Sequence, residues 1–360
     1  MSSPTSSSSR FDAYPLTFEP QLEERVWGGR GLGSFGKTLP PSIPIGESWE
    51  ISDVEGKPSK VSRGTYKGRS LQELLAIDLH AVLGGCAGNE SKTRPRFPLL
   101  LKLIEARDDL SVQVHPSDAD LRRQGRSGSG KTEAWVILAT EPGARVVYGL
   151  APGVDRAELF KRMEALAGGK LPRRDEESLF HWVEVAPGDV IFVPAGTIHA
   201  SGKGILLAEV QQTSDITYRI YDWGRPGING KPRALHLKEA QDVSDPGPVA
   251  CPSASLARAR RDSLASKGFV SVLTCDKFQI DMLASESDSR AEVRESTRQE
   301  RTEGFHVLSS VEGKARCRAP SGDELEISPG EFVLLPAALG EYSIEPSTVP
   351  MKILRFRGPE

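Results

Sequence analysis

The fold is decided by one stretch, Ser111-Val112-Gln113-Val114-His115-Pro116. Side chains of a strand alternate between its two faces, so Gln113 and His115 point one way while the two valines point the other. Pro116 has no N–H to offer a neighbouring strand, and we expect the strand to end there. The pattern predicts a strand that brings two potential metal ligands into a β-barrel.

Two other segments add the side chains that a metal site needs. A carboxylate comes from Gly130-Lys131-Thr132-Glu133-Ala134-Trp135, and a second imidazole comes from Val193-Pro194-Ala195-Gly196-Thr197-Ile198-His199-Ala200. Ligation by imidazole and carboxylate suits a divalent ion such as Zn²⁺, and an open coordination position makes such a site catalytic. A single histidine is more often a hydrogen-bonded polar residue than a ligand. The metal hypothesis therefore depends on a jelly roll that brings these segments together.

Composition and charge narrow the class of protein. The chain has 360 residues, enough for two cores, and its formal net charge of −3 with 38% hydrophobic residues is typical of a soluble globular protein. It has no basic excess for nucleic acid and no apolar run long enough to cross a bilayer. Its four cysteines lie far apart without a CxxC pair, which argues against a cysteine zinc site or a disulfide framework and favours a reducing compartment.

The chain begins with a polar, low-complexity segment, MSSPTSSSSR. Such a segment has nothing to bury, and we expect residues 1–13 to form a disordered tail. The apolar region of a secretory signal does not follow it. Its serine-rich, acid-poor composition weakly resembles a transit peptide, but a cytoplasmic location is the preferred interpretation.

A weak internal repeat indicates two similar β domains. It relates Pro187-Gly188-Asp189-Val190-Ile191-Phe192-Val193-Pro194-Ala195 to Pro329-Gly330-Glu331-Phe332-Val333-Leu334-Leu335-Pro336-Ala337. Each copy is typical of a turn, a buried strand and a second turn. The register places His199 of the first copy opposite Glu341 of the second, so the second copy lacks the metal ligands. The sequence predicts a mainly β fold of two jelly-roll barrels, the second of them degenerate.

Helical segments interrupt this β pattern at two places. Ser70 and Glu73 are spaced as a capping box for a helix over residues 70–83. Residues 155–167 show a second apolar helical face. We place a catalytic domain at residues 14–243 with a helical insertion at about 153–180, a linker at 244–262 and a C-terminal β domain at 263–360.

The other dense polar stretch is EVQQTSDITYRIYDW, which runs from Glu209 to Trp223. Burial of the Glu209 carboxylate and the Arg219 guanidinium inside a barrel costs desolvation free energy unless each group is paired or contacts a bound ligand. The structural interpretation is a salt bridge between the two. The functional interpretation is a proton-transfer carboxylate beside a cation that stabilises a developing oxyanion. Lys102 interrupts an apolar strand and is interpreted either as an edge residue or as a side chain aimed at an anionic ligand.

The segments SVQVHP, GKTEAW, VPAGTIHA and EVQQTSDITYRIYDW resemble those of the type I phosphomannose isomerases, above all the short bacterial form. The eighteen-residue step from His115 to Glu133 and the twenty-residue step from His199 to Arg219 are also similar to that form. The resemblance covers most of residues 14–240. It implies a cupin fold, one zinc ion per chain, and interconversion of mannose 6-phosphate and fructose 6-phosphate through a cis-enediol.

The resemblance also implies roles for individual residues by motif match. The metal-ligand places fall to Gln113, His115, Glu133 and His199. The catalytic places fall to Arg219, Glu209 and Lys131. The substrate-binding places fall to Ser111, Lys102 and Asp215, of which Asp215 is also the second choice for the general base after Glu209. The longer loop at residues 124–130, the helical insertion and the serine-rich start depart from the family pattern and leave lid shape and oligomeric state open.

Two other functions stay open at this stage. One is a different cupin enzyme, an isomerase or epimerase of a related sugar, which turnover of mannose 6-phosphate against free mannose would distinguish. The other is a non-catalytic or regulatory sugar-binding cupin, which would bind sugar without turnover. For the isomerase we expect a small sugar phosphate as the ligand, no nucleic acid or membrane partner, and a monomer or homodimer.

Overall fold

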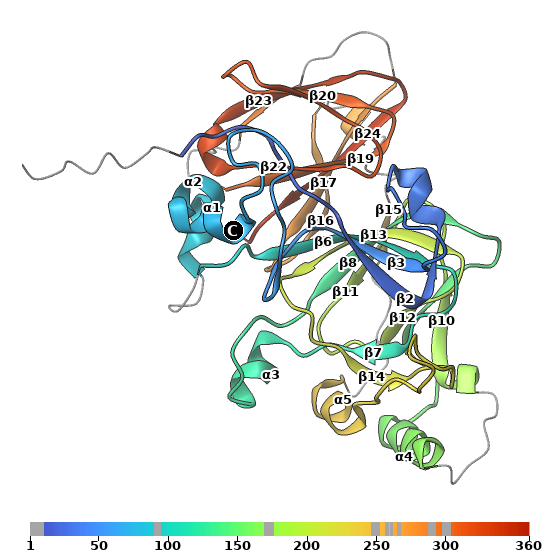
Figure 1. Ribbon diagram of the computed structural model, residues 1–360. Coiled ribbons are helices and arrows are strands. Elements are labelled where there is room, and N and C mark those ends of the chain that lie inside the picture. Colours follow the sequence, from blue (N-terminus) through green and yellow to red (C-terminus); the bar gives the residue numbers. More distant parts are fainter. Residues whose placement is uncertain are drawn as a thin grey trace, which may run out of the picture.

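The computed structural model stacks four β-sheets in layers, with helices at one end and one side of the stack (Figure 1). It describes residues 11–89, 95–168, 176–245, 253–255, 259, 262–264, 268–286, 293–296 and 304–359. The predicted tail lies outside the described residues up to position 10. Phe11, which the prediction placed in that tail, is instead buried, and its ring stacks on Tyr66 at a centroid distance of 5.2 Å.

The first barrel consists of a seven-stranded and a five-stranded sheet. In spatial order the larger sheet contains β15 (Ser253–Ser255), β11 (Asp189–Val193), β8 (Glu133–Thr140), β13 (Ile205–Gln212), β6 (Leu99–Ala106), β3 (Ile45–Ile51) and β2 (Gln21–Gly29). The smaller sheet contains β10 (Phe180–Glu184), β9 (Arg145–Leu150), β12 (His199–Ser201), β7 (Val112–Val114) and β14 (Tyr218–Tyr221). Most of the predicted linker lies outside the described residues, but its segment β15 is a strand that pairs with β11.

The second barrel repeats this two-sheet plan. Its six-stranded sheet contains β1 (Leu16–Thr17), β22 (Phe332–Leu335), β19 (His306–Glu312), β24 (Met351–Arg357), β17 (Gln279–Ser285) and β16 (Val270–Thr274). Its four-stranded sheet contains β18 (Val293–Ser296), β23 (Glu341–Pro346), β20 (Ala315–Arg318) and β21 (Glu324–Ile327), and a separate small ribbon joins β4 (Asp53–Val54) to β5 (Lys57–Pro58). The chain start thus contributes β1 to the second barrel, and the proposed domain boundaries remain a prediction.

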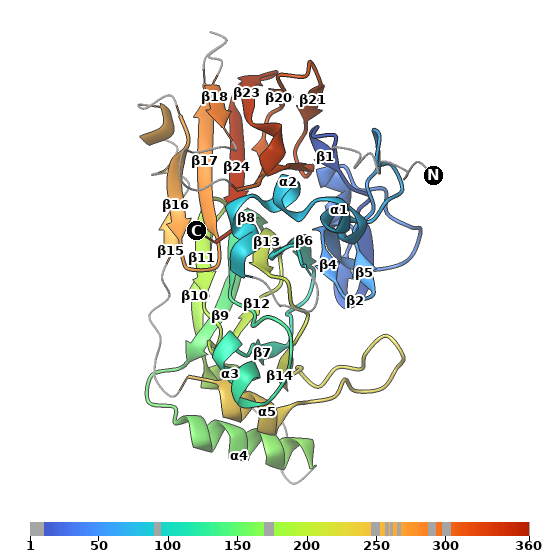
Figure 2. The ribbon, with the colours of Figure 1, turned by 90° about the vertical axis from the view of Figure 1, so that its left-hand side faces the viewer.

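The single helix predicted over residues 70–83 is instead two short helices, because the backbone of Asp78 is extended and its side chain caps a second helix. The capping box is present, because the hydroxyl of Ser70 accepts from the N–H of Glu73 and the Glu73 side chain accepts from Ser70. The α-helices are α1 (Leu71–Ile77), α2 (Leu79–Leu83), α3 (Asp118–Arg123), α4 (Arg156–Ala167) and α5 (Leu237–Val243). The 3-10 helices are η1 (Gly31–Phe35), η2 (Gly85–Asn89), η3 (Glu176–Leu179) and η4 (Ala337–Leu339). Figure 2 shows α4 and α5 beyond β7 and β14, where their apolar residues cover the outer face of the five-stranded sheet.

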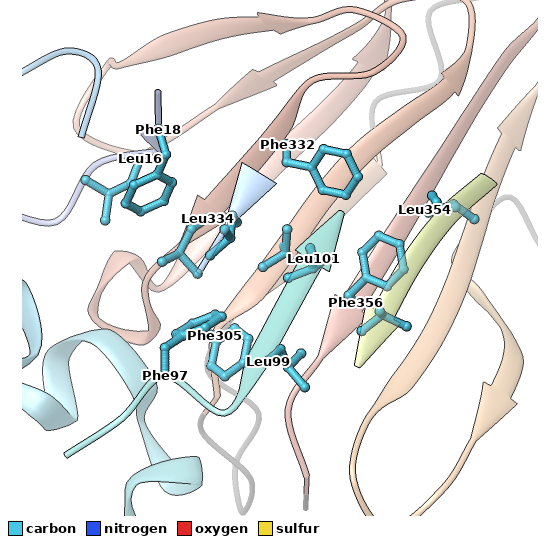
Figure 3. Packing of buried hydrophobic residues seen from close by; sticks show 14 of the residues in the cluster. Leu16, Phe18, Phe97, Leu99, Leu101, Phe305, Phe332, Leu334, Leu354 and Phe356 are labelled. Carbon is cyan, nitrogen blue, oxygen red and sulfur yellow. The ribbon is translucent and has the colours of Figure 1, made fainter. Parts of the chain in front are cut away.

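The two barrels share one hydrophobic core. The outer face of the seven-stranded sheet meets the six-stranded sheet there, and Leu99 and Leu101 belong to the same buried cluster as Phe332, Leu354 and Phe356 (Figure 3). Burial of one such side chain stabilises the fold by about 1.5–3 kcal/mol. This core therefore holds the seven-stranded sheet firmly in place, and the opposite face of that sheet is the one that carries polar side chains.

The alternation of side chains along β13 explains why polar groups reach the barrel interior. Ala208 and Val210 point into the core between the barrels, so Glu209 and Gln211 point the other way, toward the five-stranded sheet. Leu207 lies on the same inward face, in a second apolar cluster between the two sheets of the first barrel. The interior of the first barrel is thus apolar at one end and polar at the other.

Candidate active site

The five-stranded sheet carries three of the predicted site residues in one row. β7 lies between β12 and β14, and the strand register places His199 and Arg219 opposite Gln113, one on each side. Residues directly opposite in antiparallel strands point to the same face, so all three side chains lie on the inner face of the sheet. The amide nitrogen of Gln113 lies 3.4 Å from Nε2 of His199.

Two backbone carbonyls orient the histidines. Nδ1 of His115 lies 2.8 Å from the oxygen of Ile216, and Nδ1 of His199 lies 2.8 Å from the oxygen of Thr197. A ring nitrogen that donates to a carbonyl carries the proton, which leaves the lone pair on Nε2. Both Nε2 atoms point toward the same carboxylate, that of Glu133, at 3.6 and 3.3 Å.

Glu133 reaches this cluster from the facing sheet, as the first residue of β8. Its side chain is fully buried, and ligand atoms of His115, Glu133 and His199 all lie within 4.8 Å of one another. The ammonium of Lys131 bonds to Glu133 and lies 3.0 Å from Nε2 of His115, so this cluster already attracts a positive charge. The two imidazole nitrogens and the carboxylate match the donors that a divalent metal prefers. Rotation of the Gln113 side-chain amide about its last bond would add its oxygen as a fourth donor.

Burial sets the protonation state of these groups. It lowers the pKa of His199 to about 4 and that of His115 well below its ordinary value, and the charge of Lys131 adds to both effects. The two imidazoles are therefore neutral at pH 7 and free to ligate. Burial, together with the charge of Glu209, raises the pKa of Glu133 to about 7. A bound dication would oppose that change, because it favours the ionised carboxylate.

A cavity of about 440 Å³ adjoins the cluster. Its volume falls within the range of small-molecule sites, roughly 300–1,000 Å³. Seven residues predicted for the site line it: Lys102, Ser111, Gln113, Lys131, Glu209, Asp215 and Arg219. Gln113 and Lys131 line the cavity and also contact residues of the cluster, so the cavity and the cluster adjoin directly.

The charges along the cavity wall are paired within the seven-stranded sheet. Glu209 lies opposite Lys102 in the strand register, and their charged atoms are 3.2 Å apart. Lys102 also lies 3.7 Å from Glu47. Burial disfavours the charge of Glu209, but Lys131 and Lys102 outweigh it and lower its pKa. Glu209 therefore pairs with Lys102 and not with Arg219, the partner considered from the sequence. Lys102 lies on the interior strand β6, so it is not an edge residue.

Arg219 approaches the cavity from the other sheet. Its Nε donates to the hydroxyl of Ser111 at 3.2 Å, and one terminal nitrogen donates to the carbonyl of Ala234 at 2.8 Å. Burial and the charge of Arg233 lower its pKa to about 10, which leaves it protonated at neutral pH. Within the described part of the chain no carboxylate pairs with it, so its charge is available to an anion in the cavity.

Sequence reasoning missed several residues of the cavity wall. Arg25 forms a two-point contact with Glu47 at 2.8 and 3.3 Å, and both line the cavity. Trp49 and Trp135 also line it. Trp49 lies on β3, an interior strand between β2 and β6. No sequence signal marked Arg25, because its partner is chosen by strand pairing.

These features define the class of protein. Two jelly-roll barrels, a buried cluster of two histidines and a glutamate, and a charged cavity beside it are those of a two-barrel cupin with a site that could hold a metal ion. No helix in the part of the chain that the structure describes has the length and hydropathy needed to span a membrane.

Comparison with known proteins identifies the family. The model of the phosphomannose isomerase type I catalytic domain matches residues 16–127. Mannose-6-phosphate isomerase ManA of Bacillus subtilis is 36% identical over 332 residues, which span 92% of this chain and 96% of that protein. The mannose-6-phosphate isomerase of Streptococcus mutans is 41% identical over 233 residues, 64% of this chain and 68% of the relative.

Solved structures agree with these matches. The crystal structure of the Bacillus subtilis mannose 6-phosphate isomerase superposes with a TM-score of 0.74 and 28% identity, covering 96% of this chain and 99% of that one. A putative mannosephosphate isomerase from Archaeoglobus fulgidus, 22% identical with a TM-score of 0.72 over 97% of this chain and 98% of that one, shares the fold. The chain therefore belongs to the type I phosphomannose isomerase family.

Proposed function

We propose that the protein is a metal-dependent aldose–ketose isomerase that interconverts mannose 6-phosphate and fructose 6-phosphate. The observation that carries the proposal is the convergence of His115, Glu133 and His199 beside a cavity lined by Glu209 and Arg219. Relatives that are 36% and 41% identical to this chain over the aligned residues carry the name of this activity. A role limited to sugar binding gives no reason to bury an ionised carboxylate in the cavity wall at the cost of its desolvation.

We assign the metal to Gln113, His115, Glu133 and His199, and we propose that it is one zinc ion per chain. When bound, the ion supplies a Lewis acid that polarises the sugar carbonyl. The donor chemistry supports zinc, since imidazole nitrogen and carboxylate oxygen are its common ligands. Metal analysis of the purified protein tests the identity of the ion.

The proton transfer is assigned to Glu209. Starting from the open-chain aldose, its carboxylate takes the proton from C2, the C–H electron pair forms the C1–C2 double bond, and the carbonyl oxygen on C1 takes up a proton. The carboxyl group then returns its proton to C1 while the hydroxyl on C2 loses its proton and becomes the carbonyl. The lowered pKa of Glu209 supports this role, because Lys131 and Lys102 keep it ionised at neutral pH. Asp215, the second choice, is exposed at the rim.

The cations and hydroxyls of the wall bind and orient the sugar in this proposal. Arg219 lines the cavity, and among the described residues no carboxylate pairs with its charge, which suits the negative oxygens of the enediol stage. Lys131 is the third proposed catalytic residue, placed between the ligand cluster and the cavity. Ser111, Lys102 and Asp215 are the proposed substrate-binding residues, since all three line the cavity.

A test of substrate and reaction class together is turnover in D₂O, followed by NMR, of mannose 6-phosphate and of free mannose. We expect fructose 6-phosphate from the phosphorylated sugar, with solvent deuterium appearing at carbon, and little turnover of the free sugar. Equal turnover of free mannose, or an epimer as product, would instead place the protein with another sugar-converting activity.

The remaining assignments extend this proposal. We propose a cytoplasmic location, supported by four widely spaced cysteines without a CxxC pair. A monomer or a homodimer is proposed, and light scattering coupled to size-exclusion chromatography measures which of the two is present.

A further inference from the structure

We propose that Trp135 is a positioning residue that fixes the carboxylate of Glu209 relative to the metal-ligand side chain Glu133. The inference rests on the proposed role of Glu209 as the general base. Trp135 lies directly opposite Glu209 in the pairing of β8 with β13, and it follows Glu133 by two residues on the same strand. Residues two apart share a strand face, so all three side chains meet inside the barrel.

One indole N–H serves both carboxylates. Nε1 of Trp135 lies 3.1 Å from Oε1 of Glu133 and 3.0 Å from Oε2 of Glu209. Indole offers a single donor and no acceptor, so both carboxylates accept a hydrogen bond from the same N–H group. The separation between the base and the ligand cluster is thereby set by one rigid group. A carboxylate that accepts a hydrogen bond from a fixed donor also loses freedom to rotate in the cavity.

The ring of Trp135 is itself held in place. Its side chain is 2% exposed, and it meets the ring of His199 edge-on at a centroid distance of 5.5 Å. The other oxygen of Glu209 faces Lys102, whose ammonium is shared with Glu47. Lysine is a flexible point charge, whereas the indole has two side-chain torsions and a fixed N–H direction. Trp135 is therefore the partner that determines how Glu209 is oriented.

Trp49 offers a matched control within the same cavity. It is also 2% exposed, and its Nε1 donates at 2.7 Å to Glu47, the carboxylate two residues before it. It lies opposite Lys102 in the pairing of β3 with β6. Replacement by phenylalanine removes one indole N–H in either case, from Glu133 and Glu209 for Trp135 and from Glu47 for Trp49. Of the two tryptophans, only Trp135 donates to Glu209.

The kinetic test compares Trp135→Phe with Trp49→Phe on mannose 6-phosphate carrying deuterium at C2. For Trp135→Phe we expect kcat to fall roughly 10- to 100-fold with little change in KM, the range seen when a partner of an active-site ligand is removed. We expect the deuterium isotope effect on kcat to rise, because a misdirected base slows proton transfer and no later step. For Trp49→Phe we expect a change in KM and an isotope effect equal to that of the wild-type protein.

Two kinetic results would overturn the inference. One is a Trp135→Phe variant with the kcat and isotope effect of the wild-type protein. The other is a loss of activity in that variant that excess zinc restores in full, since this would limit Trp135 to holding Glu133. Metal content of each variant is measured alongside, so that the two effects are separated.

A second measurement does not depend on turnover. Indole ¹⁵N–¹H spectra of the metal-free protein show the N–H groups of its five tryptophans, and the Trp135 signal is assigned by backbone correlation. We expect Glu209→Gln to move the Trp135 signal and to leave that of Trp49 in place, because a charged acceptor is replaced by a neutral one. An unmoved Trp135 signal would overturn the contact. Absence of turnover in the wild-type protein would overturn the proposed function instead, so the two failures are distinguishable.

Discussion

Replacement of Glu209 by glutamine is the sharpest single perturbation of the proposed chemistry. The side chain keeps its shape but loses its charge and its ability to accept a proton. Loss of a positioned general base lowers kcat by about 10²–10⁴-fold, which corresponds to about 3–5 kcal/mol in the barrier. The fold is expected to survive, because Lys102 keeps a second partner in Glu47 at 3.7 Å. A weakened buried contact of this kind costs about 1–3 kcal/mol of unfolding free energy.

The assay for Glu209→Gln follows loss of deuterium from C2 of labelled mannose 6-phosphate by NMR, with zinc content measured on the same sample. We expect zinc to be retained and exchange to be lost together with turnover. Glu47→Gln is the matched control, since Glu47 also pairs with buried Lys102 and also accepts from a tryptophan. Exchange that persists in Glu209→Gln, or an equal loss in Glu47→Gln, would refute the assignment of the base.

Three further predictions concern the metal, pH and the core. His115→Ala should lower the zinc content of purified protein at least about tenfold by elemental analysis, and full zinc content would contradict its role as a ligand. Burial disfavours the charge of Glu47, but Lys102 and Arg25 outweigh it and lower its pKa from 4.5 to about 2. Its contribution of about 3 kcal/mol is therefore complete above pH 4.5 and lost as pH falls toward 2. Urea unfolding of wild type and Glu47→Gln should converge across that window, and a constant difference would exclude this linkage. Phe356→Ala in the core between the barrels should cost about 3–5 kcal/mol in the same assay, and a loss under about 1 kcal/mol would show a loosely packed core.

Local patterns in the sequence predicted much of the site. The alternation of Gln113 and His115 with valines predicted that both side chains point to the inside of the barrel. Gln113 lies on β7 and His115 directly follows its end, and the structure brings His115, Glu133 and His199 together as the metal hypothesis requires. The capping signal of Ser70 and the turn-strand-turn repeat were equally local. Each of these features depends on residues close together in the chain, whose side-chain directions follow from backbone geometry alone.

The contacts that the sequence did not predict are those set by strand pairing. The partner of Glu209 is Lys102 because β13 pairs with β6, whereas Arg219 lies in the other sheet opposite Gln113. Charge and spacing along the chain favour neither partner, so the salt bridge to Arg219 stayed open until the register was known. The shared N–H of Trp135 depends in the same way on the pairing of β8 with β13, across 74 positions of sequence. The edge strand β1 pairs with β22 of the second barrel, and the two strands lie far apart in the chain, so no local pattern predicts their pairing.

The proposed metal-dependent isomerisation is tested most directly by the conversion of mannose 6-phosphate to fructose 6-phosphate by zinc-loaded and by chelator-stripped protein in a coupled assay. We expect turnover that is lost with the metal and returns when zinc is added. An inactive zinc-loaded protein would contradict the proposed function and would leave a metal-binding cupin with a different substrate. Full activity of the stripped protein would contradict the role of His115, Glu133 and His199 as ligands of a catalytic metal.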